Sequence, residues 1–164
     1  MRRTAAVAIL FLLAPVLVAD NHHIESDDKA DFSAFKTFVV REGKAASRKA
    51  EINNKLLLKN IEEAIRASLS SKGLKETTDQ PDLVVAFGLE EEGQRGVVGR
   101  GIRNPQVISR SEGKLVIEMT SRATNGLVWH GIYTDDEGNA AKLAKKLPDD
   151  AKKLISEYPP KKKK

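Results

Sequence analysis

The strongest pattern in the chain is an apolar stripe at helical spacing between residues 53 and 73. Its members recur every three or four positions, and they are Leu57, Ile61, Ala64, Ile65 and Leu69. Asn53 or Asn54 can cap the start, because an asparagine side chain accepts a hydrogen bond from an unpaired N–H of the first turn. Gly73 can take the left-handed conformation after the last turn. The pattern therefore predicts an amphipathic helix that packs its stripe against a sheet.

Alternating positions predict strands on both sides of this helix. The second half of 31–40 alternates clearly, and residues 74–78 form a short candidate strand. Residues 83–90 are almost entirely apolar and partly β-branched, which is typical of a central strand buried on at least one face. Residues 90–106 contain four glycines and a proline, and this composition indicates a long mobile loop or a ragged hairpin tip.

Residues 115–133 predict a hairpin whose register decides where the only tryptophan lies. A two-residue Asn-Gly turn would place Trp129 on the polar side of the sheet. A three-residue loop at 124–126, with Gly126 in the left-handed conformation, would place it on the apolar side. We prefer the longer loop, because it makes Trp129 a core residue and turns His130 to the other face. It gathers on the tryptophan's face the apolar residues Leu115, Ile117, Met119, Leu127 and Tyr133.

A second helical stripe near the end of the chain completes the pattern. Its members are Leu143, Leu147, Ala151, Leu154 and Tyr158. Because proline suits the first turn of a helix, we expect a short helical turn followed by a helix from about 148 to 157. The order of strand, helix, several strands and helix predicts an α+β fold. We expect an antiparallel or mixed sheet of about five strands with two helices packed on one face.

The beginning of the chain has the pattern of a secretory signal peptide. Arg2 and Arg3 precede an apolar run that Pro15 interrupts and Asp20 closes. The run is shorter than the roughly 20 residues that a transmembrane helix needs, so an uncleaved anchor is the less favoured alternative. We expect four parts, namely a signal peptide at 1–19, a polar leader at 20–30, a single α+β domain at 31–160 and a basic disordered tail at 161–164.

Charge and cysteine content narrow the classes of partner. The net charge of +5 falls to +3 without Arg2 and Arg3, and to −1 without the lysines at 161–164. The body is therefore nearly neutral and has no basic stripe with interleaved aromatics, which argues against nucleic-acid binding. An unknown envelope protein or a small ligand is the expected partner, and membrane contact is expected only through Lys161–Lys164 or an uncleaved signal. The chain has no cysteine, so it folds without disulfides and has no thiol chemistry.

No segment carries the motif of an established reaction. The chain lacks Gly-x-Ser-x-Gly, and the glycines from 93 to 101 lack the Gly-Lys-Ser/Thr ending of a phosphate loop. Acidic residues occur as neighbours in sequence, which rarely gives the opposed geometry of a catalytic pair. We expect no enzyme activity and no catalytic residues. A hydrolase that uses a carboxylate with His130 is the less favoured alternative, and it would need both groups in one cleft.

One metal hypothesis follows from the signal peptide. Cleavage after Ala19 would leave a chain that begins Asp20-Asn21-His22. The free amine, two deprotonated amide nitrogens and the third-position imidazole can form a square-planar site for Cu(II) or Ni(II). His23 and Glu25 could assist. A periplasmic metal-binding protein is therefore the alternative to a non-catalytic binding module, and no other cofactor is expected.

Four segments between residues 31 and 160 match a known pattern, and they read "DFSAFKTF", "PDLVVAF", "KLVIEMTSRATNGLVWHG" and "ISEYPP". Together they resemble the bacterial domain of unknown function 4136 family. The matching signature positions are Asp31, Phe35, Lys36, Thr37, Trp129, Gly131 and Pro159. The resemblance implies an envelope protein of lipoprotein type with no established enzyme activity. Asp20 stands where a lipoprotein has its lipidated cysteine, so we expect an exported protein that is periplasmic or envelope-associated.

Overall fold

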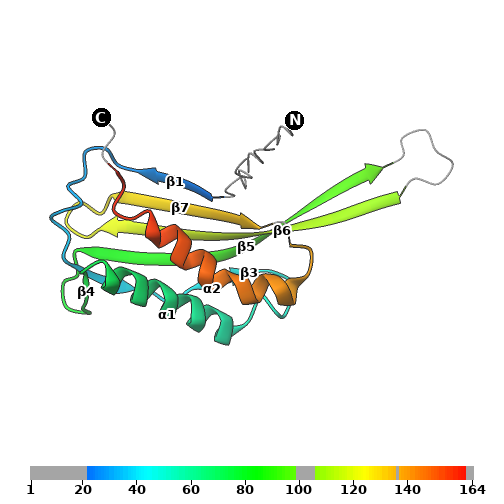
Figure 1. The fold of residues 1–164 in the computed structure, drawn as a ribbon, viewed down its shortest axis with the longest axis horizontal. Coiled ribbons are helices and arrows are strands. Elements are labelled where there is room, and N and C mark those ends of the chain that lie inside the picture. The colour runs from blue at the N-terminus through cyan, green and yellow to red at the C-terminus, as the bar shows by residue number, and fades with distance from the viewer. Residues whose placement is uncertain (1–21, 99–105, 136, 162–164) are drawn as a thin grey trace, which may run out of the picture.

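The computed structural model describes residues 22–98, 106–135 and 137–161 (Figure 1). These residues form two helices and a seven-stranded mixed sheet, so the predicted α+β class is confirmed and the sheet is larger than expected. The elements in chain order are β1 (His22–Ser26), β2 (Thr37–Val40), β3 (Lys44–Ala46), α1 (Lys55–Ser71), β4 (Lys75–Glu76), β5 (Leu83–Val98), β6 (Gln106–Ser121), β7 (Leu127–Asp135) and α2 (Ala140–Ser156).

The sheet has the strand order β1-β7-β6-β5-β2-β4, and β3 pairs with β5 beside this path. The contacts among β1, β7, β6 and β5 are antiparallel, whereas β2, β3 and β4 make parallel pairs. Both helices lie on one face of the sheet and pack against each other (Figure 1). This arrangement confirms the two helices on one face. Among the described residues, no helix is long and apolar enough to cross a membrane.

Helix α1 follows the predicted pattern closely. The Asn54 side chain accepts a hydrogen bond from the backbone N–H of Leu56 at 2.8 Å, and Gly73 has the left-handed φ of 89°. All five residues of the predicted stripe are buried. They belong to the same hydrophobic core as alternate positions of β5, which are likewise buried and are Leu83, Val85, Phe87 and Leu89. Local periodicity is sufficient here, because the helical and the strand patterns both point to the same core.

Helix α2 is longer than predicted, and Pro148 lies inside it. The expected start near residue 148 was therefore wrong. A proline inside a helix costs about 3 kcal/mol, because it removes one hydrogen bond and crowds the preceding turn. Burying one leucine side chain gains about 1.5–3 kcal/mol, and buried residues occur on both sides of the proline. These residues are Leu143, Leu147, Ala151, Leu154 and Ile155, and their burial outweighs the local cost.

Two segments that the sequence indicated as irregular are strands. Part of the expected polar leader forms β1, which pairs with β7 from His22–Tyr133 to Ser26–Trp129. The segment predicted to be a long mobile loop or a ragged hairpin tip extends β5 to Val98 and begins β6 at Gln106, as the hairpin alternative requires. Residues 99–105 lie outside the described residues. β7 pairs with β6 only as far as Gly113, so the outer part of the β5–β6 hairpin projects beyond the helices (Figure 1).

The hairpin between β6 and β7 confirms the predicted face of Trp129 but not the predicted loop. Trp129 lies opposite Met119 and is fully buried. The positive φ belongs to Asn125 rather than Gly126, and the register shifts between Met119 and Thr120. That bulge turns Leu127 outward, where 51% of its surface is exposed, so its predicted core position was wrong.

The indole of Trp129 lies directly over Gly131, two positions further along β7. A Cβ atom at residue 131 would stand 2.5 Å from the Cη2 atom of Trp129 and 3.2 Å from the Cδ1 atom of Ile24. The neighbours cannot yield easily, because the tryptophan is enclosed by the core. The glycine of the Trp-x-Gly signature therefore makes room for the tryptophan of the same signature.

We expect Gly131→Ala to lower the free energy of unfolding by about 1–3 kcal/mol, because the added methyl group overpacks the indole. Urea denaturation measures this loss. Gly138→Ala is the matched control, because a Cβ atom there meets nothing within 4 Å. Equal stability of the two variants would contradict this packing.

Candidate functional site

The signature residues meet at one end of the sheet, around four aromatic side chains that we call the aromatic row: Phe35, Phe32, Tyr158 and Trp129. The ring centroids of Phe35 and Phe32 are 5.9 Å apart, those of Phe32 and Tyr158 are 5.7 Å apart, and those of Tyr158 and Trp129 are 6.4 Å apart. Each pair is close to perpendicular, which is a favoured geometry for aromatic contacts. The aromatic row joins the connection before β2, the segment after α2 and strand β7.

The connection before β2 is fixed by Asp82, which directly precedes β5. Its Oδ2 atom accepts hydrogen bonds from the backbone N–H of Lys36 at 2.8 Å and from the backbone N–H and hydroxyl of Thr37, both at 2.9 Å. The Thr37 hydroxyl accepts in return from the backbone N–H of Asp82 at 2.9 Å. These donors, with Lys36 first, hold the pKa of Asp82 below its ordinary value. The Lys-Thr of the signature and the Asp before β5 are therefore joined by one set of hydrogen bonds.

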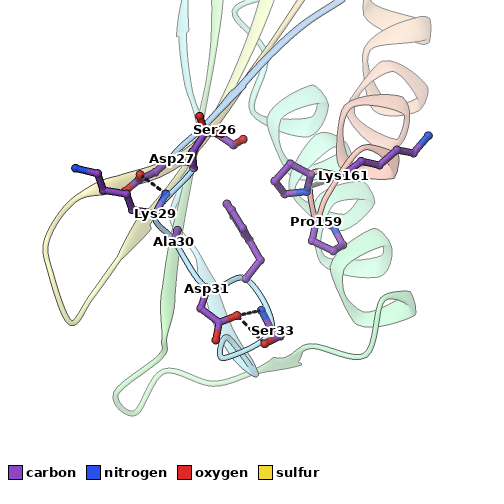
Figure 2. Close-up of a pocket in the computed structure, with 11 residues that line it drawn as sticks. Ser26, Asp27, Lys29, Ala30, Asp31, Ser33, Pro159 and Lys161 are labelled. Carbon is purple, nitrogen blue, oxygen red and sulfur yellow. Dashed lines mark hydrogen bonds between the residues drawn. The ribbon is translucent and has the colours of Figure 1, made fainter. Parts of the chain in front are cut away.

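An open pocket lies beside the aromatic row, between the β1–β2 connection and the segment after α2 (Figure 2). We call it the signature pocket. Its volume is about 820 Å³, and Phe32 of the aromatic row forms part of its wall. The residues that line it are Ser26, Asp27, Asp28, Lys29, Ala30, Asp31, Phe32, Ser33, Pro159, Pro160 and Lys161. Its two walls come from segments that are far apart in sequence, so no local motif could reveal it.

Short hydrogen bonds fix the pocket wall that residues 26–33 form. The Oδ1 atom of Asp31 accepts from the backbone N–H of Ser33 at 3.1 Å and from the Ser33 hydroxyl at 2.6 Å (Figure 2). The Oδ1 atom of Asp27 accepts from the backbone N–H of Lys29 at 2.9 Å. Such turns fix the backbone through the side chain. The wall is therefore shaped before any ligand arrives.

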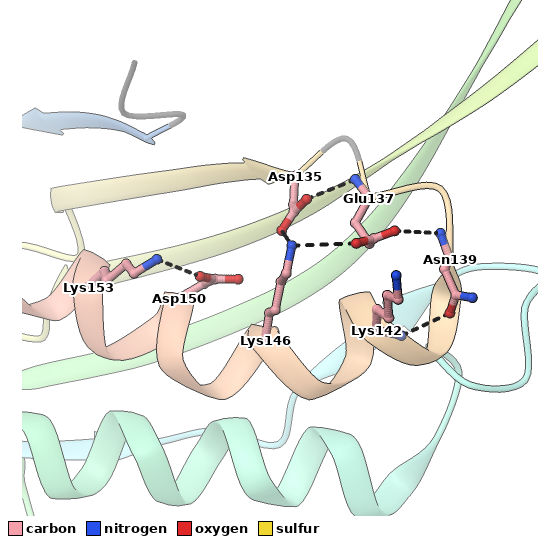
Figure 3. A network of polar contacts seen from close by, with 7 residues as sticks. All are labelled: Asp135, Glu137, Asn139, Lys142, Lys146, Asp150 and Lys153. Carbon is pink, nitrogen blue, oxygen red and sulfur yellow. Dashed lines mark hydrogen bonds and ion pairs between the residues drawn. The ribbon is translucent and has the colours of Figure 1, made fainter. Parts of the chain in front are cut away.

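A second polar cluster lies between α2 and β7 (Figure 3). Asp150 is only 2% exposed, its Oδ1 atom is 3.3 Å from the Nζ atom of Lys153, and its Oδ2 atom has no partner among the described protein groups. Burial raises the pKa of Asp150 more than the attraction of Lys153 lowers it. Lys153 also lies 5.3 Å from the ring centroid of Tyr133. This cluster ties the helix to the strand and opens into no described pocket.

The neighbouring half of the cluster is an ion-pair network. The Nζ atom of Lys146 lies 3.3 Å from the Oδ2 atom of Asp135 and 3.7 Å from the Oε2 atom of Glu137 (Figure 3). The carboxylate of Asp135 also accepts a hydrogen bond from the backbone N–H of Glu137 at 2.8 Å. Within the described ranges, no three His, Cys, Asp or Glu side chains form a group that could hold a metal ion.

Two of the three residues proposed for copper, His22 and His23, lie at the start of β1. Asp20 lies outside the described residues, His22 pairs with Tyr133 in the sheet, and His23 is exposed. The Nε2 atom of His23 is 2.9 Å from the Oε1 atom of Glu25, and this hydrogen bond is the main cause that lowers the pKa of Glu25. The metal site of Asp20, His22 and His23 therefore stays a prediction.

His130 lies on the face of the sheet opposite to Trp129. In the strand register it stands between Glu25 of β1 and Glu118 of β6, so carboxylates flank it on both sides. It does not line the signature pocket. The hydrolase alternative needed His130 and a carboxylate in one cleft, and the described pocket does not offer that arrangement.

Sequence reasoning found the signature but not what it builds. Trp129 was predicted to be a core residue, whereas the other signature positions were identified without a physical role, namely Asp31, Phe35, Lys36, Thr37, Gly131 and Pro159. Phe32 and Asp82 were not singled out, and Tyr158 was identified only as a member of the second helical stripe, although each contacts or completes the same assembly. The quoted segments "DFSAF", "PDL" and "EYPP" contain them, so the signal was present as motif neighbours.

The fold and the pocket define a small α+β module with an open site at one end of its sheet. Residues 23–160 match the family described as "Domain of unknown function (DUF4136)", and the chain belongs to this family. The match includes all of β1 except His22, and the resemblance from residue 31 onward had left this strand out. No curated protein matches the chain.

Two crystal structures share the fold. A PDZ domain protein from Parabacteroides distasonis is 15% identical with a TM-score of 0.63, and the match covers 88% of this chain. The chain spans only 36% of the length of that protein. A DUF4136 family protein from Bacteroides thetaiotaomicron is 18% identical with a TM-score of 0.56, and the match covers 84% of this chain and 94% of that one.

We expect Asp150→Asn to stabilise the protein relative to wild type at neutral pH, by about 1 kcal/mol, because it removes a charge that burial disfavours. The folded-state pKa of Asp150 is raised, so its contribution to stability is lost as the pH rises from the ordinary value of 3.8 through the raised value. The advantage of the variant should therefore grow with pH and vanish near pH 4. Urea denaturation across this range measures it.

Asp149→Asn is the matched control for this prediction. The hydrogen bond from Lys152 at 2.8 Å lowers the pKa of exposed Asp149, so the sign of its pH dependence is opposite. If Asp150→Asn instead became progressively less stable than the wild type as the pH rises, the argument would be contradicted.

Proposed function

We propose that this protein is exported to the cell envelope and acts there as a non-catalytic module that binds a ligand or a partner in the signature pocket. The observation that carries the proposal is the construction of the pocket. The family signature supplies Asp31 and Pro159 directly to its walls, and the aromatic row behind them supplies Phe32.

The position of the pocket supports a binding role. Binding residues are often carried on loops that a rigid scaffold holds in place. Here Asp82 fixes Lys36 and Thr37, which follow one wall along the chain, and the contact of Tyr158 with Phe32 joins the two walls. The volume of about 820 Å³ also falls within the range of about 300–1,000 Å³ that small-molecule sites occupy.

Export is supported by the first 19 residues, which combine two arginines, an apolar run and small Ala19. Asp20 at the position of the lipidated cysteine favours a protein that is released rather than anchored by lipid. The proposal therefore places the binding module in the periplasm or at the envelope surface that faces it.

Copper binding is the alternative function, and one observation favours it. His23 and Glu25 are exposed and hydrogen-bonded to each other directly after His22, so further ligands stand beside the proposed amino-terminal site. That site forms only if the chain begins at Asp20 with a free amine.

Native mass spectrometry of the protein recovered from fractionated host cells tests the proposal. We expect a chain that begins at Asp20, found in the periplasmic or envelope fraction, with an additional mass from a retained ligand. Asp28→Asn should lower the fraction of the protein that carries this additional mass, because Asp28 is exposed and lines the pocket. Asp79→Asn, which changes an exposed aspartate outside the pocket, is the matched control.

A chain that still begins at Met1 and stays in the cytoplasm would contradict export. A ligand mass that both variants retain equally would contradict binding in the signature pocket. Copper added to the same preparation separates the alternative, because a Cu(II) adduct that depends on the free amine supports the amino-terminal site.

A further inference from the structure

The chemistry of the signature pocket limits the ligands that fit it. One part of its lining is apolar and consists of Ala30, Phe32, Pro159 and Pro160. Phe32 is partly buried, and its edge-to-face contacts with Phe35 and Tyr158 fix the ring in place. A fixed aromatic ring beside two prolines offers a firm apolar surface to the C–H face of a ring-shaped ligand.

The rest of the lining is polar and carries charges of both signs. The carboxylates belong to Asp27, Asp28 and Asp31, and the ammonium groups belong to Lys29 and Lys161. Three negative and two positive groups nearly cancel, so the pocket has no strong preference for an ion. An anionic ligand would meet three carboxylates, and a strongly cationic ligand would meet two lysines.

The same polar groups suit a neutral ligand with many hydroxyl groups. The carboxylates accept hydrogen bonds from hydroxyls, and the lysines and the hydroxyl of Ser26 can donate to hydroxyl oxygens. A sugar ring combines this ring of hydroxyls with an apolar C–H face. All of the pocket's charged side chains are exposed, so the site is open at its rim and can accept part of a longer chain.

We infer that the signature pocket binds a neutral oligosaccharide, with the C–H face of one sugar ring against Phe32 and its hydroxyls on the pocket's carboxylates. This inference rests on the proposed binding function and names the chemical class of its ligand. Two other occupants are possible in principle. One is a basic peptide, such as a segment like the chain's own lysines at 162–164, and the other is an acidic oligosaccharide.

The test uses the full chain recovered from its host. An array of neutral hexose and N-acetylhexosamine oligosaccharides identifies a binder, and isothermal titration measures its affinity beside tetralysine and an oligogalacturonate. We expect a neutral oligosaccharide to bind and the two charged probes not to bind. Phe32→Ala should weaken binding at least tenfold, whereas Phe32→Tyr, which keeps the ring, should stay within threefold.

Asp28→Asn is a second test in case Phe32→Ala does not fold, because Asp28 is exposed and its substitution should not disturb folding. It should weaken binding about tenfold, which is the effect of losing one hydrogen bond of about 1.4 kcal/mol. Asp79→Asn should leave the affinity unchanged. The inference would be overturned if both single variants, Asp28→Asn and Phe32→Ala, bound the oligosaccharide with the affinity of the wild type.

The outcomes separate this inference from the function on which it rests. Binding of tetralysine or oligogalacturonate in place of the neutral sugars, lost in Asp28→Asn, overturns the saccharide and leaves the binding function standing. Binding of none of these probes overturns the saccharide as well. The binding function itself is removed if the native mass spectrum shows no retained ligand, or if Asp28→Asn and Asp79→Asn retain the ligand equally.

Discussion

The contact between Phe32 and Tyr158 is the interaction on which the signature pocket depends. It joins the connection after β1 to the segment after α2, two parts of the chain that no hydrogen-bonded strand pair unites. Burial, and secondarily the charge of Asp82, raise the pKa of Tyr158 to about 12, so the ring stays neutral at any physiological pH. Ionisation of Tyr158 therefore does not disturb the contact in this range of pH.

Other features of the fold can be understood as support for this contact. Trp129 of β7 packs against Tyr158, and its indole has room to do so only because residue 131 has no side chain. Asp82 holds Thr37, which sets where the connection before β2 enters the sheet and hence where Phe35 and Phe32 lie. The signature is thus one assembly in which each residue positions the next. The pocket is the surface that this assembly leaves open.

The sequence predicted those parts of the structure that depend on local periodicity. The stripe of α1 and the buried face of β5 were correct, because many residues at regular spacing point to the same answer. Trp129 was placed on the correct face, because side-chain direction in a strand depends only on the parity of the register. The identity of the loop residue in the left-handed conformation did not follow, since Asn125 and Gly126 both suit it.

The parts that could not be predicted depend on contacts between distant segments. Helix α2 continues through Pro148 because both of its halves reach the same core, and β1 carries only one strong apolar residue, Ile24, by which to recognise it. The signature pocket is the extreme case. Its walls are more than a hundred residues apart in sequence, and the aromatic row that unites them has no periodicity.

A double-mutant cycle on Phe32 and Tyr158 tests this account most directly. The free energy of unfolding is measured by urea denaturation for the wild type, Phe32→Leu, Tyr158→Leu and the double variant. The account predicts a favourable coupling of about 0.5–1.5 kcal/mol between the two rings. A coupling indistinguishable from zero would mean that the two walls are held independently, and it would contradict the central role given to this contact.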